Sequence, residues 1–173
     1  MSGSVVLTIV SDDHPGIVET LSHVLQEHGG SWAESSMLTL AGKFAGILLA
    51  DLPPGRADAF IAALQSLESK GLHIVAQKTA ANTEHPGEFH EFTLDLVGQD
   101  RPGIVHDITE ILTRHHVNVH ELDTERQSAS MSGETLFLAK ARMRVPQGAS
   151  IERLRKELED LANELMVDIK LDE

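Results

Sequence analysis

The sequence Asp-His-Pro-Gly-Ile-Val at positions 13–18 returns 87 residues later as Asp-Arg-Pro-Gly-Ile-Val at positions 100–105. The likeness extends beyond these two motifs, because ten of the 32 residues from Val5 to Ser36 are identical at this offset. Further along the chain the offset grows to 93, and the six extra residues fall near the small polar segment 127–133, which predicts a lengthened loop. The chain therefore contains two copies of one small module.

The hydrophobic pattern of each copy predicts a strand, a helix, two strands, a second helix and a last strand. In the first copy a β-rich run at 5–10 leads into the motif, and Pro15 suits the first turn of a helix that ends at Gly29-Gly30. The next two strands flank Ala41-Gly42, and a second helix ends at Gly71. This order predicts an α+β fold with two ferredoxin-like βαββαβ modules, each an antiparallel sheet with its helices on one face.

The boundaries of the modules follow from the segment between the copies, which holds an Asn, a Pro and a Gly. We expect module 1 at residues 1–80, a linker at 81–89 and module 2 at 90–173. A module of about 80 residues is marginal for independent stability, so burial against a neighbour is favoured. The two copies in one chain can supply that neighbour, and the homodimer that we also expect would extend the sheets or helical layers further.

The composition excludes several classes of function. The 173 residues include 14 Lys and Arg against 27 Asp and Glu, and both halves are acidic, with 4 basic and 9 acidic residues in 1–84 and 10 and 18 in 85–173. Direct nucleic-acid binding is not expected, because phosphate contacts need clustered basic residues. The absence of cysteine excludes a thiolate nucleophile, and no apolar run reaches the roughly 18 residues of a membrane span. We expect a soluble cytoplasmic protein without membrane contacts.

The repeated motif carries the candidate binding chemistry. Each copy turns a strand directly into a helix, and the free N–H groups at a helix start attract a carboxylate or a phosphate. Gly16 and Gly103 have no side chain, so a ligand can come close to the backbone there. A second interpretation stays open at this point, because Pro-Gly also makes a tight strand-to-helix turn with a purely structural role.

The motif and the module that contains it resemble the ACT domain family, as does Val117-Asn118-Val119 at the entry to the second strand of the second copy. ACT domains are small regulatory modules that commonly bind amino acids at the interface between two modules. The resemblance covers both repeats. It implies a non-catalytic, amino-acid-sensing regulatory protein without a cofactor, with glycine or serine as the ligand. It further implies control of glycine cleavage genes, and because both halves of the chain are acidic we expect a DNA-binding protein partner to contact the DNA.

The resemblance also implies which residues bind the ligand. The Gly and Ile of each motif would offer backbone N–H groups to its carboxylate, and Asn118 would reach it from the second strand of a neighbouring module. The first copy has the shorter Ser31 in that place, and His14 is a conditional cation where Arg101 is always charged, so the two sites should be inequivalent. The predicted ligand-binding residues are Asp13, His14, Gly16, Ile17, Ser31, Asp100, Arg101, Gly103, Ile104 and Asn118.

Three alternatives remain beside this hypothesis. The chain could be a stand-alone regulatory subunit of an amino-acid or one-carbon metabolic enzyme, or a scaffold whose modules have lost ligand binding. It could also be a metal-assisted hydrolase that uses the cluster His115, His116, His120, Glu121 and Asp123, in which His116 and His120 are expected on one face of a strand. A zinc site needs three or four converging ligands, and the first copy offers only two side chains there, so no bound metal is expected.

Overall fold

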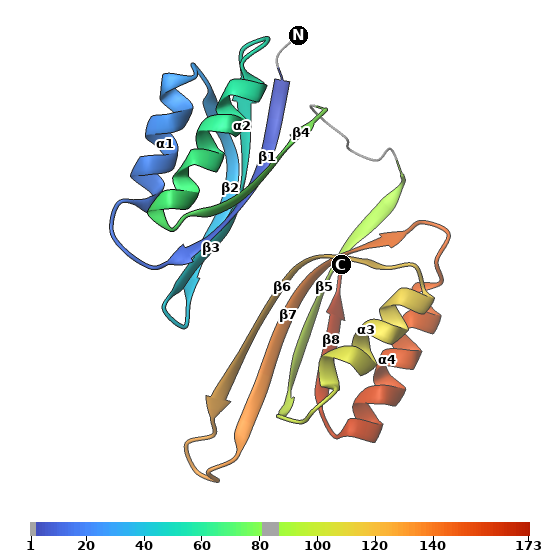
Figure 1. Cartoon of the computed structure of the whole chain (residues 1–173). Coiled ribbons are helices and arrows are strands. Elements are labelled where there is room, and N and C mark those ends of the chain that lie inside the picture. Colours follow the sequence, from blue (N-terminus) through green and yellow to red (C-terminus); the bar gives the residue numbers. More distant parts are fainter. Residues whose placement is uncertain (1–2, 81–86) are drawn as a thin grey trace. The chain divides into compact units, whose positions relative to one another are not determined.

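The computed structural model describes residues 3–80 and 87–173, and the chain divides into two compact units between residues 84 and 85 (Figure 1). Most of the expected linker, residues 81–86, lies outside the described residues. Among the described residues, no helix is long and apolar enough to cross a membrane.

Both units have the predicted order of strands and helices (Figure 1). Module 1 consists of β1 (Gly3–Asp12), α1 (Ile17–Glu27), β2 (Ser31–Leu40), β3 (Lys43–Leu52), α2 (Ala57–Gln65), the 3-10 helix η1 (Ser66–Lys70) and β4 (His73–Thr79). Module 2 consists of β5 (Phe89–Gln99), α3 (Ile104–Arg114), β6 (Asn118–Ser128), β7 (Thr135–Pro146), α4 (Ile151–Leu165) and β8 (Asp168–Asp172).

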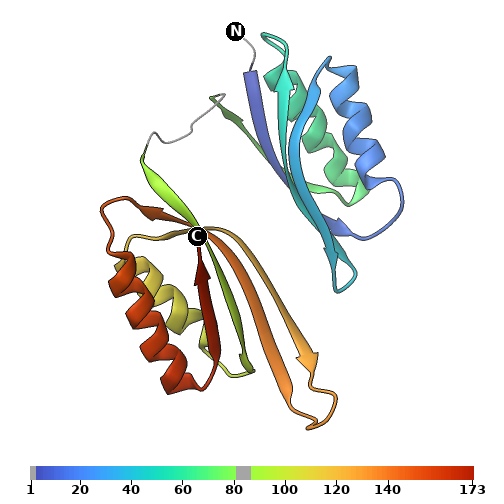
Figure 2. The same cartoon turned by 180° about the vertical axis from the view of Figure 1, so that it is seen from behind.

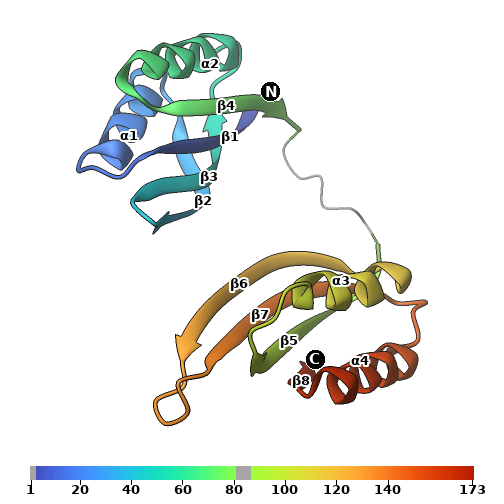
Figure 3. The ribbon, with the colours of Figure 1, turned by 60° about the horizontal axis from the view of Figure 1, so that its bottom comes forward.

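Each module is a four-stranded antiparallel sheet with the strand order β2-β3-β1-β4 or β6-β7-β5-β8, and Figure 2 shows the same strands from behind. The two helices of a module lie together on one face of its sheet, which Figure 3 shows clearly for α1 and α2. This arrangement confirms the predicted ferredoxin-like fold of both copies.

The core of each module lies between its sheet and its two helices. Side chains alternate along a strand, so Leu7 of β1 and Leu48 of β3 point toward the helices, where they meet Leu21 and Phe60. The equivalent core of module 2 is also aliphatic, with one phenylalanine fully within it. Its most buried members are Leu96, Met143, Val145, Leu154 and Leu158. The opposite face of each sheet has no described helix on it.

The two hairpins differ as the lengthened offset predicts. Ala41 and Gly42 join β2 to β3 with φ angles of 50° and 78°, which suit a two-residue turn of type I′. The corresponding connection in module 2 runs through residues 129–134. Beside the short turn, Lys43 forms an ion pair with Asp12, its register partner on β1, and so closes the strand that leads into the first motif.

Gly98 lies at a point in β5 where a side chain has no room. It is buried on the helix-facing side, and a Cβ atom there would be 2.2 Å from Cγ1 and 2.7 Å from Cβ of Val167. We expect Gly98→Ala to lower the free energy of unfolding by about 1–3 kcal/mol, because the neighbouring chain must move. Denaturant unfolding measures this change. Gly148→Ala is the control, since open space surrounds Gly148, and an equal loss in both variants would contradict the prediction.

The Asp12–Lys43 pair makes a prediction about pH. The hydrogen bond and the charge of Lys43 hold the pKa of Asp12 below its usual value of 3.8. A carboxyl group with a lowered pKa contributes stability that is complete above its unfolded-state pKa and is lost as the pH falls through its folded-state pKa. An NMR titration should therefore place the midpoint of Asp12 below 3.8, and Lys43→Gln should move it upward. A midpoint that Lys43→Gln leaves in place would refute the assignment to this pair.

Candidate functional site

The loop at residues 100–103 joins the end of β5 directly to α3. Gly103 is the last residue before the helix and has a φ angle of 87°, in the left-handed region. Its carbonyl oxygen accepts a hydrogen bond from the N–H of Asp107 at 2.9 Å, and no side chain caps the helix start. The N–H groups of the first turn are therefore without a side-chain acceptor, which is the arrangement that attracts an anion.

The loop at residues 13–16 repeats this geometry before α1. Gly16 has a φ angle of 93°, and again no side chain caps the helix. Its carbonyl oxygen accepts hydrogen bonds from Thr20, from the backbone N–H at 2.9 Å and from the hydroxyl group at 2.8 Å. The side chains of Ile17 and Ile104 are buried in the two cores, so only their backbone groups are placed for binding.

The backbone conformation of Gly16 and Gly103 explains why both positions are glycine. A Cβ atom at Gly16 or Gly103 would meet no atom within 4 Å, so crowding does not exclude other residues. The φ angles of about 90° disfavour other residues, because this conformation strains residues that carry a side chain. The same conformation serves a ligand-binding loop and a structural turn, so the geometry of these glycines is compatible with both interpretations of the motif.

The aspartates of the two motifs anchor the loops to the neighbouring hairpins. The backbone N–H of Asp13 donates to the carbonyl oxygen of Gly42 at 3.0 Å, and that of Asp100 donates to the carbonyl oxygen of Thr135 at 2.9 Å. The carboxylate of Asp100 also lies 3.6 Å from the guanidinium group of Arg126 on β6. These contacts position the loops.

The second motif residue is engaged differently in the two modules. One guanidinium nitrogen of Arg101 lies 3.3 Å from a carboxylate oxygen of Asp107, in the first turn of α3. His14 contacts the carbonyl oxygen of Pro15 through Nδ1 at 2.9 Å. Both side chains are solvent-exposed. Asp107, a residue that sequence reasoning missed, therefore already occupies the guanidinium group that was predicted to bind a ligand carboxylate.

Asn118 lies far from the loop of its own module. It pairs with Arg144 of β7, which pairs with Glu91 near the start of β5, whereas the loop follows Gln99 at the end of that strand. Gln99 is eight residues beyond Glu91, which corresponds to about 26 Å along the strand. One module therefore does not bring Asn118 and its own loop together.

Ser31 has the same position in module 1. It pairs with Asp51 of β3, which pairs with Ser4 near the start of β1, at the end of the sheet opposite the first loop. In both modules the second strand runs parallel to the first, so its start always lies at the end away from the motif. The strand order, once known, accounts for this separation.

The histidine cluster does not form the expected strand face. His116 precedes β6 and has a positive φ of 57°, and His120 falls at an irregularity in the pairing of β6 with β7, between Val119 and Glu121. His115 is mostly buried and lies 3.2 Å from a carboxylate oxygen of Glu157 on α4. Among the described residues, no group of three or more His, Cys, Asp or Glu side chains is placed to hold a metal ion.

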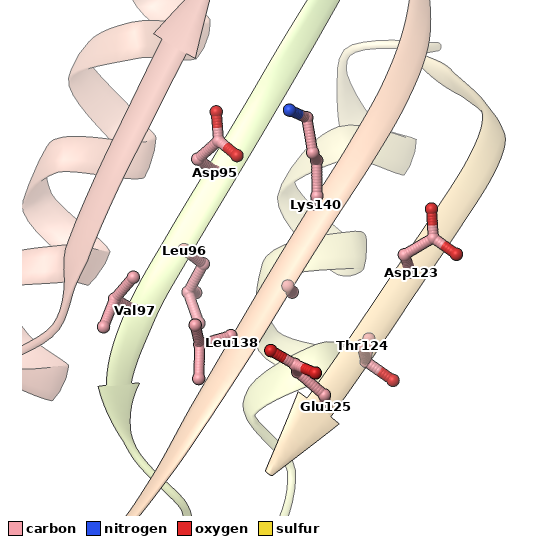
Figure 4. A pocket seen from close by; sticks show the side chains of 9 residues that line it. Asp95, Leu96, Val97, Asp123, Thr124, Glu125, Leu138 and Lys140 are labelled. Atoms are coloured by element: carbon pink, nitrogen blue, oxygen red, sulfur yellow. The ribbon is translucent and has the colours of Figure 1, made fainter. Parts of the chain in front are cut away.

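A hollow of about 460 Å³ lies on the helix-free face of module 2 and was not predicted from the sequence (Figure 4). Lys140 of β7 stands between Asp95 of β5 and Asp123 of β6, to which it is paired in register. The residues of the second loop do not line this hollow. The charges of Asp95, Lys140 and Asp123 alternate in sign across its strands, and Val97 and Leu138 line it beside them.

Comparisons with known proteins agree with this architecture. A model of the ACT domain family matches residues 4–77 and 90–172. No curated protein matches the sequence. Among solved structures, an "Unknown Protein from Galdieria sulphuraria" is 28% identical, with a TM-score of 0.87 and coverage of 99% of this chain and 98% of that one.

A second solved structure, a "putative glycine cleavage system transcriptional repressor", has a TM-score of 0.68, with coverage of 99% of this chain and 97% of that one. At 18% identity this likeness shows a shared fold. The family model, by contrast, accounts for nearly the whole length of both modules. The chain therefore belongs to the ACT domain family, and each of its two modules is an ACT domain.

Proposed function

We propose that the protein is a non-catalytic regulator that senses a small amino acid, glycine or serine, through its strand-to-helix loops. The observation that carries this proposal is the repeated helix start without a capping side chain, found at Gly16 and again at Gly103. A ligand carboxylate would accept hydrogen bonds from the N–H groups of this first turn. The regulatory character of ACT domains supports the proposal.

The second loop is the stronger candidate. Arg101 adds a permanent positive charge beside Gly103, and an exposed ion pair such as Arg101–Asp107 costs little to open. The ligand would replace Asp107 as the partner of the guanidinium group. At the first loop, His14 supplies charge only when it is protonated.

Asn118 would complete the site from another module. It lies about 26 Å from the loop of its own sheet, so a ligand that contacts both must bind to two modules at once. Binding would then stabilise one association of modules over another, and partner affinity would change by the difference in ligand affinity between the two states.

The proposed output is the control of glycine cleavage genes through a protein partner. The name of the second structural neighbour, which shares the two-module fold, supports this output. Both halves of the chain are acidic, so contact with DNA would come from the partner. A metabolic enzyme of amino-acid or one-carbon chemistry is the alternative partner.

Ligand specificity is tested by thermal unfolding of the full chain with each common amino acid in turn. At a concentration about 100 times the dissociation constant, binding adds ~2.7 kcal/mol to the free energy of unfolding. We expect glycine or serine to raise Tm, and the other amino acids to leave it unchanged. A flat response to all of them would favour the scaffold alternative.

The residues of the site are tested by calorimetric titration with the amino acid that raises Tm. We expect Arg101→Gln and Asn118→Ala each to weaken binding about tenfold or more, because each removes a hydrogen bond to a charged ligand. Gly103→Val should abolish binding by distorting the loop. Gly55→Val is its control, since Gly55 also has a positive φ and open surroundings but lies between β3 and α2. Unchanged affinity in Arg101→Gln and Asn118→Ala would refute this site.

The partner is tested in two steps. Purified protein mixed with glycine cleavage promoter DNA at physiological salt should show no change in fluorescence anisotropy, because its net charge of -13 repels phosphate. Affinity purification with and without the amino acid should then recover a protein with a DNA-binding domain in one condition more than the other. Recovery of a metabolic enzyme would favour the alternative, and tight DNA binding by the protein alone would overturn the proposal.

A further inference from the structure

We propose that the helix-free face of the module 1 sheet binds the same face of a second copy of the chain. This face, called here the open face of module 1, carries apolar side chains from all four strands. Its members are Val6, Val10, Leu38, Ile47, Leu49 and Val75. The side chains of Val10, Leu38, Ile47 and Val75 are 50%, 55%, 49% and 64% exposed.

The registers of the two sheets allow the open faces to be compared row by row. The central row of module 1 runs across the four strands as Ser36, Ile47, Thr8 and Val75. The equivalent row of module 2 is Asp123, Lys140, Asp95 and Lys170. Four uncharged residues in one repeat thus stand where the other repeat has four charges of alternating sign.

This difference shows that the fold itself does not require an apolar open face. Module 2 has the same topology and carries charged side chains in its central row, although Val97 occupies the place of Val10. A contiguous exposed patch of large apolar side chains is uncommon on a monomer and usually marks an interaction site. Ile47 and Val75, which module 2 replaces with lysines, therefore have a role outside the folding of their own module.

The apolar side chains of the open face of module 1 determine which kind of surface can pack against it. A charged surface such as the open face of module 2 would lose hydration against Ile47 and Val75 without gaining ionic partners. The matching surface must be flat and apolar. Among the described residues, the sheet face with this character is that of module 1 itself, so a second copy is the partner with complementary chemistry. Two such sheets would pack face to face, about 10 Å apart.

The size of the face suits a stable dimer. Four strands spaced at about 4.8 Å, with about ten residues each at roughly 3.3 Å, cover a footprint of about 600 Å². The accessible surface of such a ridged face exceeds its flat footprint, and a standard interface buries about 800 Å² on each partner. A shallow groove of about 240 Å³ offers a recess for side chains of the partner; Val6, Ile47 and Leu49 line it together with Glu34, Ser35 and Ser36 of the edge strand β2.

Sedimentation equilibrium of the full chain, without any amino acid, tests the proposal independently of ligand binding. We expect the wild-type protein to have twice the chain mass at micromolar concentration, and high salt should not dissociate it because the interface is apolar. Ile47→Lys combined with Val75→Lys introduces the residues of module 2 at the same places. This variant should raise the dissociation constant at least tenfold.

The control changes the equivalent positions of the other module. Lys140→Gln combined with Lys170→Gln should leave the dimer intact. Val75→Thr keeps the shape of the side chain, so it folds even if the double lysine variant does not, and it should weaken association several-fold. A monomeric wild-type protein, or a dimer that withstands both the lysine and the threonine substitutions, would overturn the proposal.

Discussion

In the part of the chain that the structure describes, the α-helices of each module cover one face of its sheet and leave the other face open, and the rest of the structure depends on this constraint. Side chains alternate along a strand, so every second residue must fill the space beneath the helices. Val5, Leu7 and Ile9 of β1 do so, and all three are buried. The alternate residues do not contribute to the core of their own module, so their chemistry can differ between the two repeats.

The two modules have the same strand-to-helix loop but different side chains on the open face of the sheet. Both motifs place a left-handed glycine before the first helix, and both aspartates hold the loop to the neighbouring hairpin. The open face of module 1 is apolar at Ile47 and Val75, whereas module 2 has lysines there. The two modules therefore share the geometry of the loop before the first helix and differ in the chemistry of the open face.

The fold was predictable to a large extent because its signals are local. Helix spacing, the Ala41-Gly42 turn and the repeated motif each act within a few residues, and tertiary packing agrees with all of them. The ionic contacts of the site were not predictable. Arg126 and Glu157 reach Asp100 and His115 from distant elements, and their approach depends on the curvature and register of the sheet.

By itself, the sequence determined the two-module organisation, the order of the elements, the loops that start α1 and α3, and the acidity of both halves. Only the tertiary structure decided that Asn118 lies at the opposite end of the sheet from its loop and that Ile47 and Lys140 occupy equivalent places on opposite kinds of surface. The physical reason is that periodicity specifies which side of a strand a residue takes, whereas strand order and register specify its neighbours.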